Sequence, residues 1–582
     1  MTDQARTIRN GLICTLTFAA CFWISWPVAQ MGFDDDWSYI RTAQLYAHTG
    51  HFHYGWTSAM LGWQVPWGAL FIRLFGFSFM AVKLSTLPLA CASVFLFYLI
   101  LIRFGIHENN AIIGTLTLGL SPLFLPLAAS FMTDIPSLLV ILVCLYCCQR
   151  AMAARTDAAA VGWICFAAAS NFLGGTVRQI VWLGALVIVP GTAWFLRKRR
   201  GVLLAASLLW VGTVVSTLWL MYWFAAQPNV IDDPLINTAF PSFAALLYLF
   251  GALLCLLLVL FPLVAAWLPR LRTARGASLL AIASALMLVV VIQIVANWTL
   301  PWIPHSLMSE FSVGAGAQLG VDRGRFIFPN WACLLFSALI AAACLALAQT
   351  LRTQLRTGEK FPRSILVRPM FWLLGPYFLS YCALLIVHAR QEGGIFDRYL
   401  LGLMPFAIAP LIRLYELRIA PRLPSISFAM LAFYAFLAIA GTHDWFAWQR
   451  ARLAAISELR AAGVPRTRIQ GGYEYDGWTQ LETAGYINDP RSVIPRSAYH
   501  PNDHRPNVPK ACQFYFVDET PVVHPDYTVA FVQPMSCLIA GKYSPVYYRA
   551  WLPPFHRAIY IQRIPAPAIQ PAIEPHPRLA KN

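Results

Sequence analysis

Charged residues are scarce in this sequence. Asp, Glu, Lys and Arg together make up 12% of its 582 residues, whereas hydrophobic residues make up 58%. A soluble globular chain has about a quarter charged residues and about half apolar ones. The composition is therefore not that of a soluble enzyme of this length, and it predicts a chain that lies mostly in a membrane.

The sequence also lacks the short motifs that mark several classes of enzyme. It contains no Walker A pattern, no dinucleotide-binding fingerprint, no His-Glu-x-x-His and no serine-hydrolase elbow. The chain therefore shows no sign of using a nucleotide itself. It has no internal repeat either, which counts against the secondary transporters that are built from duplicated halves.

Apolar runs long enough to cross a hydrocarbon core of roughly 30 Å recur through the first three quarters of the chain. The first run is long and has no small-residue cleavage site before Asp34, so we interpret it as a retained helix rather than a cleaved signal peptide. We predict about thirteen transmembrane helices. They are expected at residues 11–30, 79–101, 110–129, 135–150, 158–176, 180–196, 202–225, 243–268, 277–299, 329–350, 370–388, 399–416 and 425–441.

Loops rich in Lys and Arg alternate with loops poor in them, and the run Arg197-Lys198-Arg199-Arg200 is the densest example. By the positive-inside rule this pattern predicts a cytoplasmic N-terminus. The net charge of +17 then reflects topology, and no nucleic-acid partner is expected. Acidic residues concentrate on the opposite, extracytoplasmic side, at Asp34, Asp35, Asp36, Asp134, Asp232, Asp233, Glu310, Asp322, Glu392 and Asp397.

Three consecutive carboxylates, Asp34, Asp35 and Asp36, open the first loop on that side, residues 31–78. Carboxylates so close to lipid are costly, and their proximity should raise the pKa of at least one of them. A carboxylate with a raised pKa suits a general base. The alternative is that an Asp caps a helix over residues 36–48, and both readings can hold together.

A single acid, Asp134, stands in the short second loop, where its depth predicts a functional role. The alternative is again a helix start, with Pro136 in the first turn. Three histidines in the first loop match no strong zinc pattern, namely His48, His51 and His53.

Basic residues on the acidic side need a reason, because they break the charge bias of the loops. They are Lys83, Arg178 with its neighbour Gln179, and Arg398, which follows Asp397. Binding of a phosphate would supply one, since Arg is well suited to phosphate oxygens. The alternative is pairing with the carboxylates of the same side, including a local salt link between Asp397 and Arg398.

Beyond residue 441 charged residues and prolines become more frequent, and no further span is expected. A helix at 447–463 is predicted, followed by strands near 468–474, 513–517, 527–533 and 557–563, with Gly471–Trp478 as strand plus turn. These elements indicate a small extracytoplasmic α/β domain over residues 442–582. Its two cysteines, Cys512 and Cys537, could pair in an oxidising compartment.

This arrangement resembles the GT-C glycosyltransferases, and it is most similar to the branch of the protein O-mannosyltransferases and the lipid A aminoarabinose transferases. The resemblance covers the membrane part, residues 1–441, and implies an all-α polytopic fold with a small extracytoplasmic domain. It also implies transfer of a sugar from a polyprenyl-phosphate carrier to a lipid, glycan or protein acceptor, with inversion of the anomeric centre. The compact loops and the resemblance favour a bacterial inner-membrane protein with undecaprenyl phosphate as the carrier.

The family's acidic pair is followed by an aromatic residue, as Asp35 and Asp36 are by Tyr39. The resemblance implies that Asp35 is the base, that Asp36 is its neighbour and that Asp134 is the second-loop acid. It also implies that Lys83 and Arg178 hold the carrier phosphate. The family usually has Asp-Glu where this chain has Asp-Asp, and Asp34 adds a third acid that could displace the base by one position.

Clustered carboxylates can also hold Mg²⁺ or Mn²⁺, a question that the resemblance leaves open. A transporter or flippase for a lipid-linked glycan is the alternative function, in which acids would line a path inside the bundle. Here the acids stand at loop starts, which favours chemistry at the surface. A further alternative is a non-catalytic relative in which Asp35 and Asp134 are replaceable.

Overall fold

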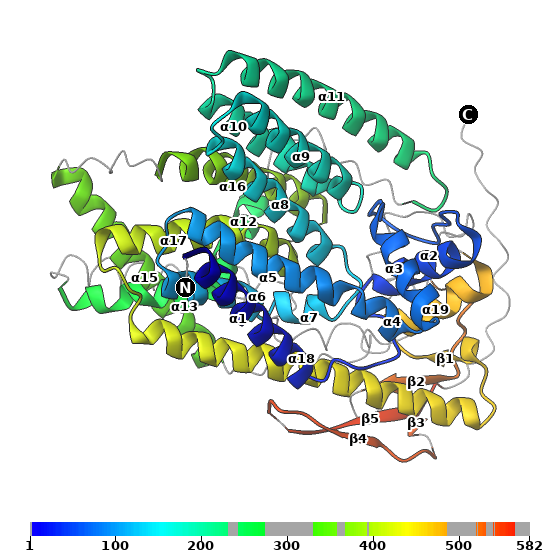
Figure 1. Cartoon of the computed structure of the whole chain (residues 1–582). Helices are drawn as coiled ribbons and strands as arrows, with labels where there is room; N and C mark the ends of the chain where they lie inside the picture. The colour runs from blue at the N-terminus through cyan, green and yellow to red at the C-terminus, as the bar shows by residue number, and fades with distance from the viewer. Residues whose placement is uncertain are drawn as a thin grey trace.

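The computed structural model describes residues 3–230, 243–273, 330–357, 367–392 and 395–485, and in the C-terminal part residues 520, 522–530, 539–540, 542–553 and 555–564. Most of the described chain is helical, and a small sheet lies along one side of the helices (Figure 1). Several sequence-based expectations fall outside the described residues. They are the span 277–299, the strand 513–517, Cys512, Cys537, Asp232, Asp233, Glu310 and Asp322.

The first 230 residues form the helices that carry most of the predicted site. Their bounds are α1 (Asp3–Ile24), α2 (Asp36–Thr49), α3 (Gln64–Phe75), α4 (Phe79–Leu84), α5 (Thr86–Arg103), α6 (Glu108–Gly119), α7 (Phe124–Ala128), α8 (Asp134–Met152), α9 (Asp157–Gly175), the 3-10 turn η1 (Gln179–Trp182), the π-helical η2 (Gly184–Ile188), α10 (Val189–Phe195) and α11 (Arg200–Ala225).

The second half of the bundle packs against the first half. Its elements are α12 (Phe243–Val259), α13 (Phe261–Val264), the 3-10 segment η3 (Ala265–Thr273), α15 (Asn330–Thr357), α16 (Val367–Glu392), the 3-10 segment η5 (Asp397–Gly402), α17 (Met404–Arg418) and α18 (Ser425–Ala461).

Six of the described helices are long and apolar enough to cross a membrane, and a seventh span results if α12 and the helix after it, bent by 71°, cross as one. The chain is thus a multi-pass membrane protein, with fewer such spans in its described part than the sequence predicts. The expected span 110–129 is instead the two short helices α6 and α7. Pro122 lies between them, and a proline disfavours helix at the residue before it.

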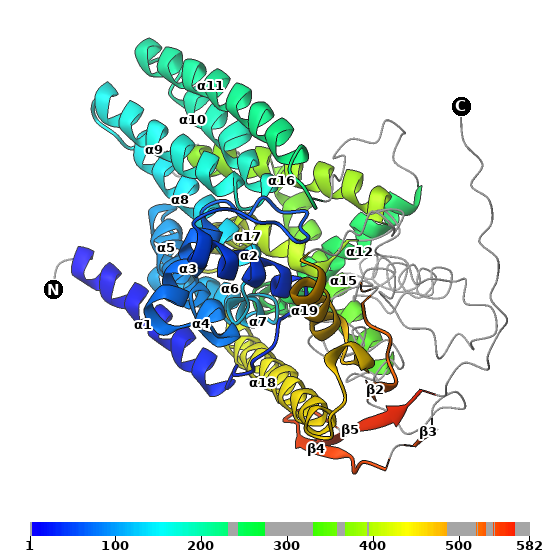
Figure 2. The same cartoon turned by 90° about the vertical axis from the view of Figure 1, so that its right-hand side faces the viewer.

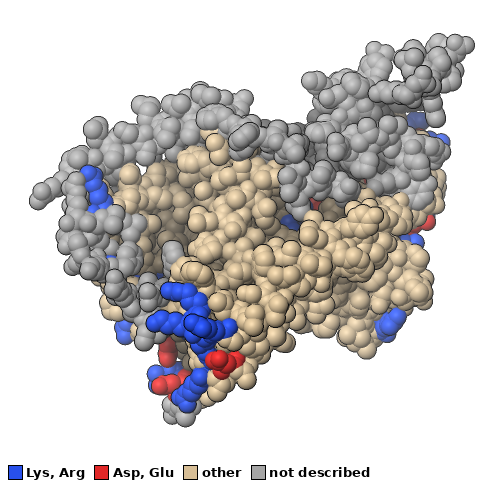
Figure 3. All heavy atoms as spheres, turned by 90° about the horizontal axis from the view of Figure 1, so that it is seen from above, with Lys and Arg blue, Asp and Glu red and all other residues tan. Residues whose placement is uncertain are grey.

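Charge is rare on the surface of this bundle. On the face seen in Figure 3, most of the described surface is uncharged, and the largest group of Lys and Arg lies next to Asp and Glu. Among the basic run 197–200, Arg199 pairs with Asp157 at 2.5 Å, where α9 begins and α10 has ended. This pair joins two helix ends and leaves the apolar faces of these helices free of its charges.

Helix α18 joins two elements that the sequence predicts as separate. The expected span 425–441 and the expected helix 447–463 form one continuous helix of 37 residues. No proline interrupts it between these parts, so the change of composition near residue 441 marks new surroundings and not a helix end. The helix stops before Gly463, whose φ of +84° favours glycine, and Pro465 follows.

The small sheet contains β1 (Ile469–Gln470), β2 (Tyr527–Ala530), β3 (Ile539–Ala540), β4 (Val546–Arg549) and β5 (His556–Arg563). β1 is parallel to β2, and β5 is antiparallel to β2, β3 and β4. Register places Thr528 opposite Gln562 and Arg549 opposite His556. The predicted strand 557–563 is confirmed as β5, and the predicted strand 527–533 is confirmed as β2 over residues 527–530, since 531–533 lie outside the described residues.

The segment Gly471–Trp478 is not strand plus turn. The strand β1 ends at Gln470, Gly472 turns the chain with a φ of +96°, and helix α19 (Tyr473–Ala484) begins at once. Its aromatic residues suggest a strand by propensity, but they are buried against other parts of the protein. Tertiary packing decides the structure here.

Helix α19 packs on α2 of the first loop, although more than 400 residues separate them, and Figures 1 and 2 both show the two side by side. The contact is close: a Cβ added at Gly477 would lie 2.7 Å from the ring of Trp37. The C-terminal part is therefore docked directly on the loop that carries Asp34, Asp35 and Asp36.

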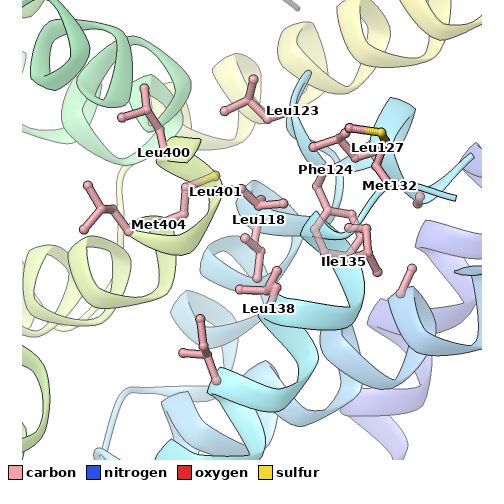
Figure 4. Close-up of a cluster of buried hydrophobic side chains, with 14 of the residues drawn as sticks. Leu118, Leu123, Phe124, Leu127, Met132, Ile135, Leu138, Leu400, Leu401 and Met404 are labelled. Atoms are coloured by element: carbon pink, nitrogen blue, oxygen red, sulfur yellow. The ribbon is translucent and has the colours of Figure 1, made fainter. Parts of the chain in front are cut away.

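An apolar cluster fixes the other side of the site. Leu118, Phe124 and Leu138 from α6 to α8 pack near Leu400 and Leu401 of η5 (Figure 4). Asp134 begins α8 and Asp397 begins η5, so this core fixes the starts of both elements.

Candidate active site

Five of the predicted site residues come together around one tyrosine ring. We call Asp34, Asp35, Asp134, Arg178 and Arg398 the open cluster. The guanidinium carbon of Arg178 lies 4.6 Å from the centre of the Tyr399 ring, and that of Arg398 lies 5.7 Å from it. Residues from the first loop, α8, the turn after α9 and η5 thus share one small region.

Arg398 binds the first loop. Its Nη1 donates to a carboxylate oxygen of Asp34, and its Nη2 donates to Oδ2 of Asp35 at 3.2 Å. Asp397, its neighbour in sequence, is buried where η5 begins. Of the alternatives raised by the sequence, pairing with the acids of this side is therefore the one that the structure shows for Arg398.

Asp35 stands at the N-cap position of α2, but its side chain makes no capping hydrogen bond. Its Oδ1 instead accepts a hydrogen bond of 3.1 Å from the hydroxyl of Tyr473, at the start of α19. About 17% of the Asp35 side chain is exposed. The helix begins where the sequence predicts, yet the carboxylate is held for contacts other than capping.

Asp134 pairs with Arg178, whose Nη1 donates to its Oδ1. The other oxygen, Oδ2, is buried and has no hydrogen-bond partner in the described part of the chain. Arg178 precedes η1 in an extended conformation. Gln179 points elsewhere, since its side-chain amide donates to the carbonyl of Ser58 at 3.2 Å.

Electrostatics of the open cluster centre on Asp34 and Arg398. Burial raises the pKa of Asp34 to about 8, the neighbouring Asp35 adds to the rise, and Arg398 opposes it. The 28% of its side chain that remains exposed moderates this shift through solvent. Burial lowers the pKa of Arg398, but Asp34, Tyr399 and Asp35 outweigh it and hold that pKa well above its usual value.

The neighbouring Tyr39 is also buried beside these charges. Burial and then the carboxylate of Asp35 raise the pKa of its phenol well above its usual value, against Arg398 and Arg178. Tyr39 therefore stays protonated, and its ring helps to wall the cluster.

A second group of charged residues lies beneath α19. We call Asp36, Lys83, Arg452, Glu474 and Asp476 the sealed cluster, because all of them are buried. Arg452 and Glu474 form an ion pair of 2.9 Å in which neither side chain is exposed. The ammonium group of Lys83 donates a hydrogen bond to the carbonyl of Met31, and its nitrogen lies 5.4 Å from the centre of the Phe446 ring.

Both oxygens of the Asp36 carboxylate accept hydrogen bonds. Oδ1 accepts from the backbone N–H of Phe33 at 2.6 Å and Oδ2 from that of Phe131 at 2.9 Å, which ties the first loop to the second. Burial raises the pKa of Asp36 to about 6, against Lys83 and these two N–H groups. Burial likewise raises the pKa of Asp476 to about 8, against the N–H of Gly471.

The structure therefore divides the residues that the sequence groups together. Asp35 lies in the open cluster and its neighbour Asp36 in the sealed one. Lys83, expected at the carrier phosphate with Arg178, is buried beside Asp36 instead.

The described residues contain no group of three or more His, Cys, Asp or Glu side chains arranged to hold a metal ion. Between Asp34 and Asp35 the cation is the guanidinium of Arg398. His48, His51 and His53 are exposed.

Sequence reasoning missed two residues of this region. Tyr399 follows Arg398 directly in the sequence, but no local pattern predicts that its ring contacts the guanidinium groups of both Arg178 and Arg398. No local pattern marks Tyr473 either: it lies 438 positions from Asp35 in the sequence, and only the docking of α19 brings them together.

Searches of protein-family models and of curated protein sequences give no match to this chain. Among solved structures it is similar to ArnT from Cupriavidus metallidurans bound to undecaprenyl phosphate, with 13% identity, a TM-score of 0.41, and 94% of this chain and 97% of that chain covered. It is also similar to the oligosaccharyltransferase of Archaeoglobus fulgidus in its apo form, with 15% identity, a TM-score of 0.42, and 90% and 69% covered.

A third similar structure is the protein O-mannosyltransferase Pmt1-Pmt2 complex of S. cerevisiae bound to its sugar donor. Identity is 11%, the TM-score is 0.32, and the match spans 40% of this chain and 35% of that chain. The glycosyltransferases that the sequence resembles are thus among the solved structures that it matches.

Proposed function

We propose that this chain is an inverting glycosyltransferase that moves a sugar from a polyprenyl-phosphate carrier to an acceptor hydroxyl at the end of the bundle that bears the open cluster. We further propose that this end faces the extracytoplasmic side. The observation that supports the proposal best is the arrangement of a partly exposed carboxylate, Asp35, beside two arginines that flank Tyr399.

Each part of the reaction has a group suited to it. The acceptor oxygen forms a bond to the anomeric carbon, the bond from that carbon to the phosphate oxygen breaks, and the carrier phosphate leaves with the electron pair. Asp35 accepts the proton of the acceptor hydroxyl as general base. Arg398 and Arg178 stabilise the charge that develops on the phosphate.

The ion pairs seen in the cluster fit this role. Arg398 and Arg178 are each bound to carboxylates. A donor phosphate can exchange with these carboxylates as a guanidinium partner, which frees Asp35 to face the acceptor. We assign to Asp134 the orientation of Arg178, because its Oδ1 accepts from that guanidinium group.

The test is transfer from radiolabelled polyprenyl-phosphate sugars in membranes that contain the native chain, Asp35→Asn or Asp157→Asn at equal expression. Asp157 is an acid at the start of α9 whose partner is Arg199, so it serves as the matched control. Native membranes and Asp157→Asn should consume a donor, whereas Asp35→Asn should lose about 10²- to 10⁴-fold in rate. Equal consumption by all three would remove Asp35 as the base, and movement of an intact lipid-linked sugar across the membrane without transfer would favour a flippase.

A further inference from the structure

A cavity lies on the opposite face of α18 from the sealed cluster. It has a volume of about 540 Å³ and opens between α18 and β4. On α18, Gln449 donates a hydrogen bond to the carbonyl of Gly32 in the first loop, and Arg452 donates one to Glu474 of α19. Arg450 and Ala451 line the cavity, so it is separate from the candidate active site.

The contacts of Arg450 show where this cavity lies along the length of the helical bundle. Its Nη1 donates to the carbonyls of Trp26 at 3.3 Å and Val28 at 2.9 Å. These residues directly follow α1, the first apolar helix, which ends at Ile24. The cavity thus lies level with the end of a candidate span, where the headgroups of a bilayer are found and where aromatic residues gather.

The lining is cationic and aromatic. Arg450 and Arg549 contribute its positive charge, and no acidic residue is among the described residues that line it. His443 also lines the cavity, and its Nδ1 lies 3.0 Å from Oδ1 of Asp444. Asp444 lies nearby, but its two oxygens accept from the backbone N–H groups of Trp551 and Leu552. The carboxylate of Asp444 is therefore already bound within the protein, whereas the side chain of Arg549 is exposed at the cavity.

The aromatic side chains form a wall beside these charges. The His443 ring stacks on Trp551 with centroids 4.1 Å apart. Tyr547 is 75% exposed and Trp551 41% exposed. Tyr547 and Arg549 are two residues apart on β4 and so project from the same face of the strand.

We propose that this cavity binds an anionic phospholipid through its headgroup phosphate, with Arg549 and Arg450 as its partners and Tyr547 and Trp551 at the level of the glycerol. Guanidinium groups match phosphate oxygens in charge and geometry. Such a site holds the sheet and the outer part of α18 against the membrane surface. It goes beyond the proposed function and does not depend on it.

The experiment uses the full chain in a neutral detergent and counts bound lipids by native mass spectrometry. The probes are dihexanoylphosphatidylglycerol, dihexanoylphosphatidylcholine and inorganic phosphate. Arg549→Gln removes one exposed guanidinium group from the cavity. Arg563→Gln is the matched control, because Arg563 is exposed at the end of β5 in the same sheet and does not line the cavity.

The native chain should bind the phosphatidylglycerol about tenfold more tightly than the phosphatidylcholine. Arg549→Gln should lose that preference, by about tenfold in affinity, because one charge-assisted hydrogen bond is removed. Arg563→Gln should bind as the native chain does. Equal binding of the two lipids, equal loss in both variants, or displacement of the lipid by inorganic phosphate at matched concentration would overturn the proposal.

Discussion

Asp35 and Asp36 are adjacent in the sequence, yet their carboxylates lie in different clusters of charged side chains. The open cluster and the sealed cluster each contain three acids and two basic residues. They differ in access: Asp34, Asp35, Arg178 and Arg398 keep part of their side chains exposed, whereas Arg452 and Glu474 expose nothing. The same kinds of side chain therefore serve two different purposes in one molecule.

The difference shows why charge in a membrane protein does not by itself locate an active site. Burial of an ion pair removes the hydration of both charges, and only close partners compensate for the lost hydration energy. Removal of one partner is therefore strongly destabilising. A partly exposed pair can exchange its partner for an anionic substrate. On this account the sealed cluster docks α19 on the first loop, and the open cluster is where a donor phosphate is bound.

The largest expected effect is in the sealed cluster. Glu474→Gln leaves Arg452 buried without its carboxylate, and the free energy of local opening of α19 should fall by about 3–5 kcal/mol. Hydrogen exchange of the α19 amides measures this opening. Glu482→Gln on the same helix breaks the more exposed pair with Arg466 and should cost about 0–1 kcal/mol. Equal effects of the two variants would show that burial does not separate the pairs.

A large effect on rate is expected in the open cluster. Arg398→Gln removes a guanidinium group that is placed to stabilise the leaving phosphate, and kcat/KM for the donor should fall by about 10²- to 10³-fold. Exchange of the α19 amides should stay as in the native chain. The control is Arg199→Gln, which breaks the pair with Asp157 where α11 begins. If Arg398→Gln transferred sugar at the native rate, phosphate binding by this residue would be wrong.

A smaller effect should come from the hydrogen bond between Tyr473 of α19 and Asp35 of the open cluster. Tyr473→Phe removes the hydroxyl that donates to Asp35, and kcat should fall about tenfold while KM for the donor is kept. Tyr475→Phe makes the same change two residues later, where the ring lies 5.2 Å from the Arg466 guanidinium, and should leave both constants unchanged. A loss in KM alone would place Tyr473 in donor binding and not in the positioning of Asp35.

The smallest effect concerns pH. With its pKa raised to about 8, Asp34 keeps its proton below that pH. Above pH 8 Asp34 gains a negative charge, which repels the donor phosphate. KM for the donor should therefore rise about 3- to 10-fold as pH increases through 8. Asp34→Asn should abolish the rise; an unchanged pH profile in this variant would assign the titration to another group.

Much of this arrangement could be predicted from local sequence. Helix α2, the acids of the first two loops and the arginines of the same side follow from hydropathy and charge at loop ends. The division between open and sealed clusters could not be predicted, because it depends on α19, whose aromatic residues suggest a strand until they are packed against Trp37. The continuity of α18 was hidden for a related reason, since its composition changes where its surroundings change.

The most direct test of the account compares Asp35→Asn with Asp36→Asn in the same preparation, with donor transfer and α19 hydrogen exchange measured on each. The account predicts that Asp35→Asn loses transfer by at least about 10²-fold and keeps native exchange. Asp36→Asn should expose α19 to faster exchange, because Asp36 begins α2, on which α19 packs, and holds it through the bonds to Phe33 and Phe131. Folded molecules of this variant should keep their transfer rate. The opposite pairing of effects, with Asp36→Asn inactive but natively protected and Asp35→Asn active, would contradict it.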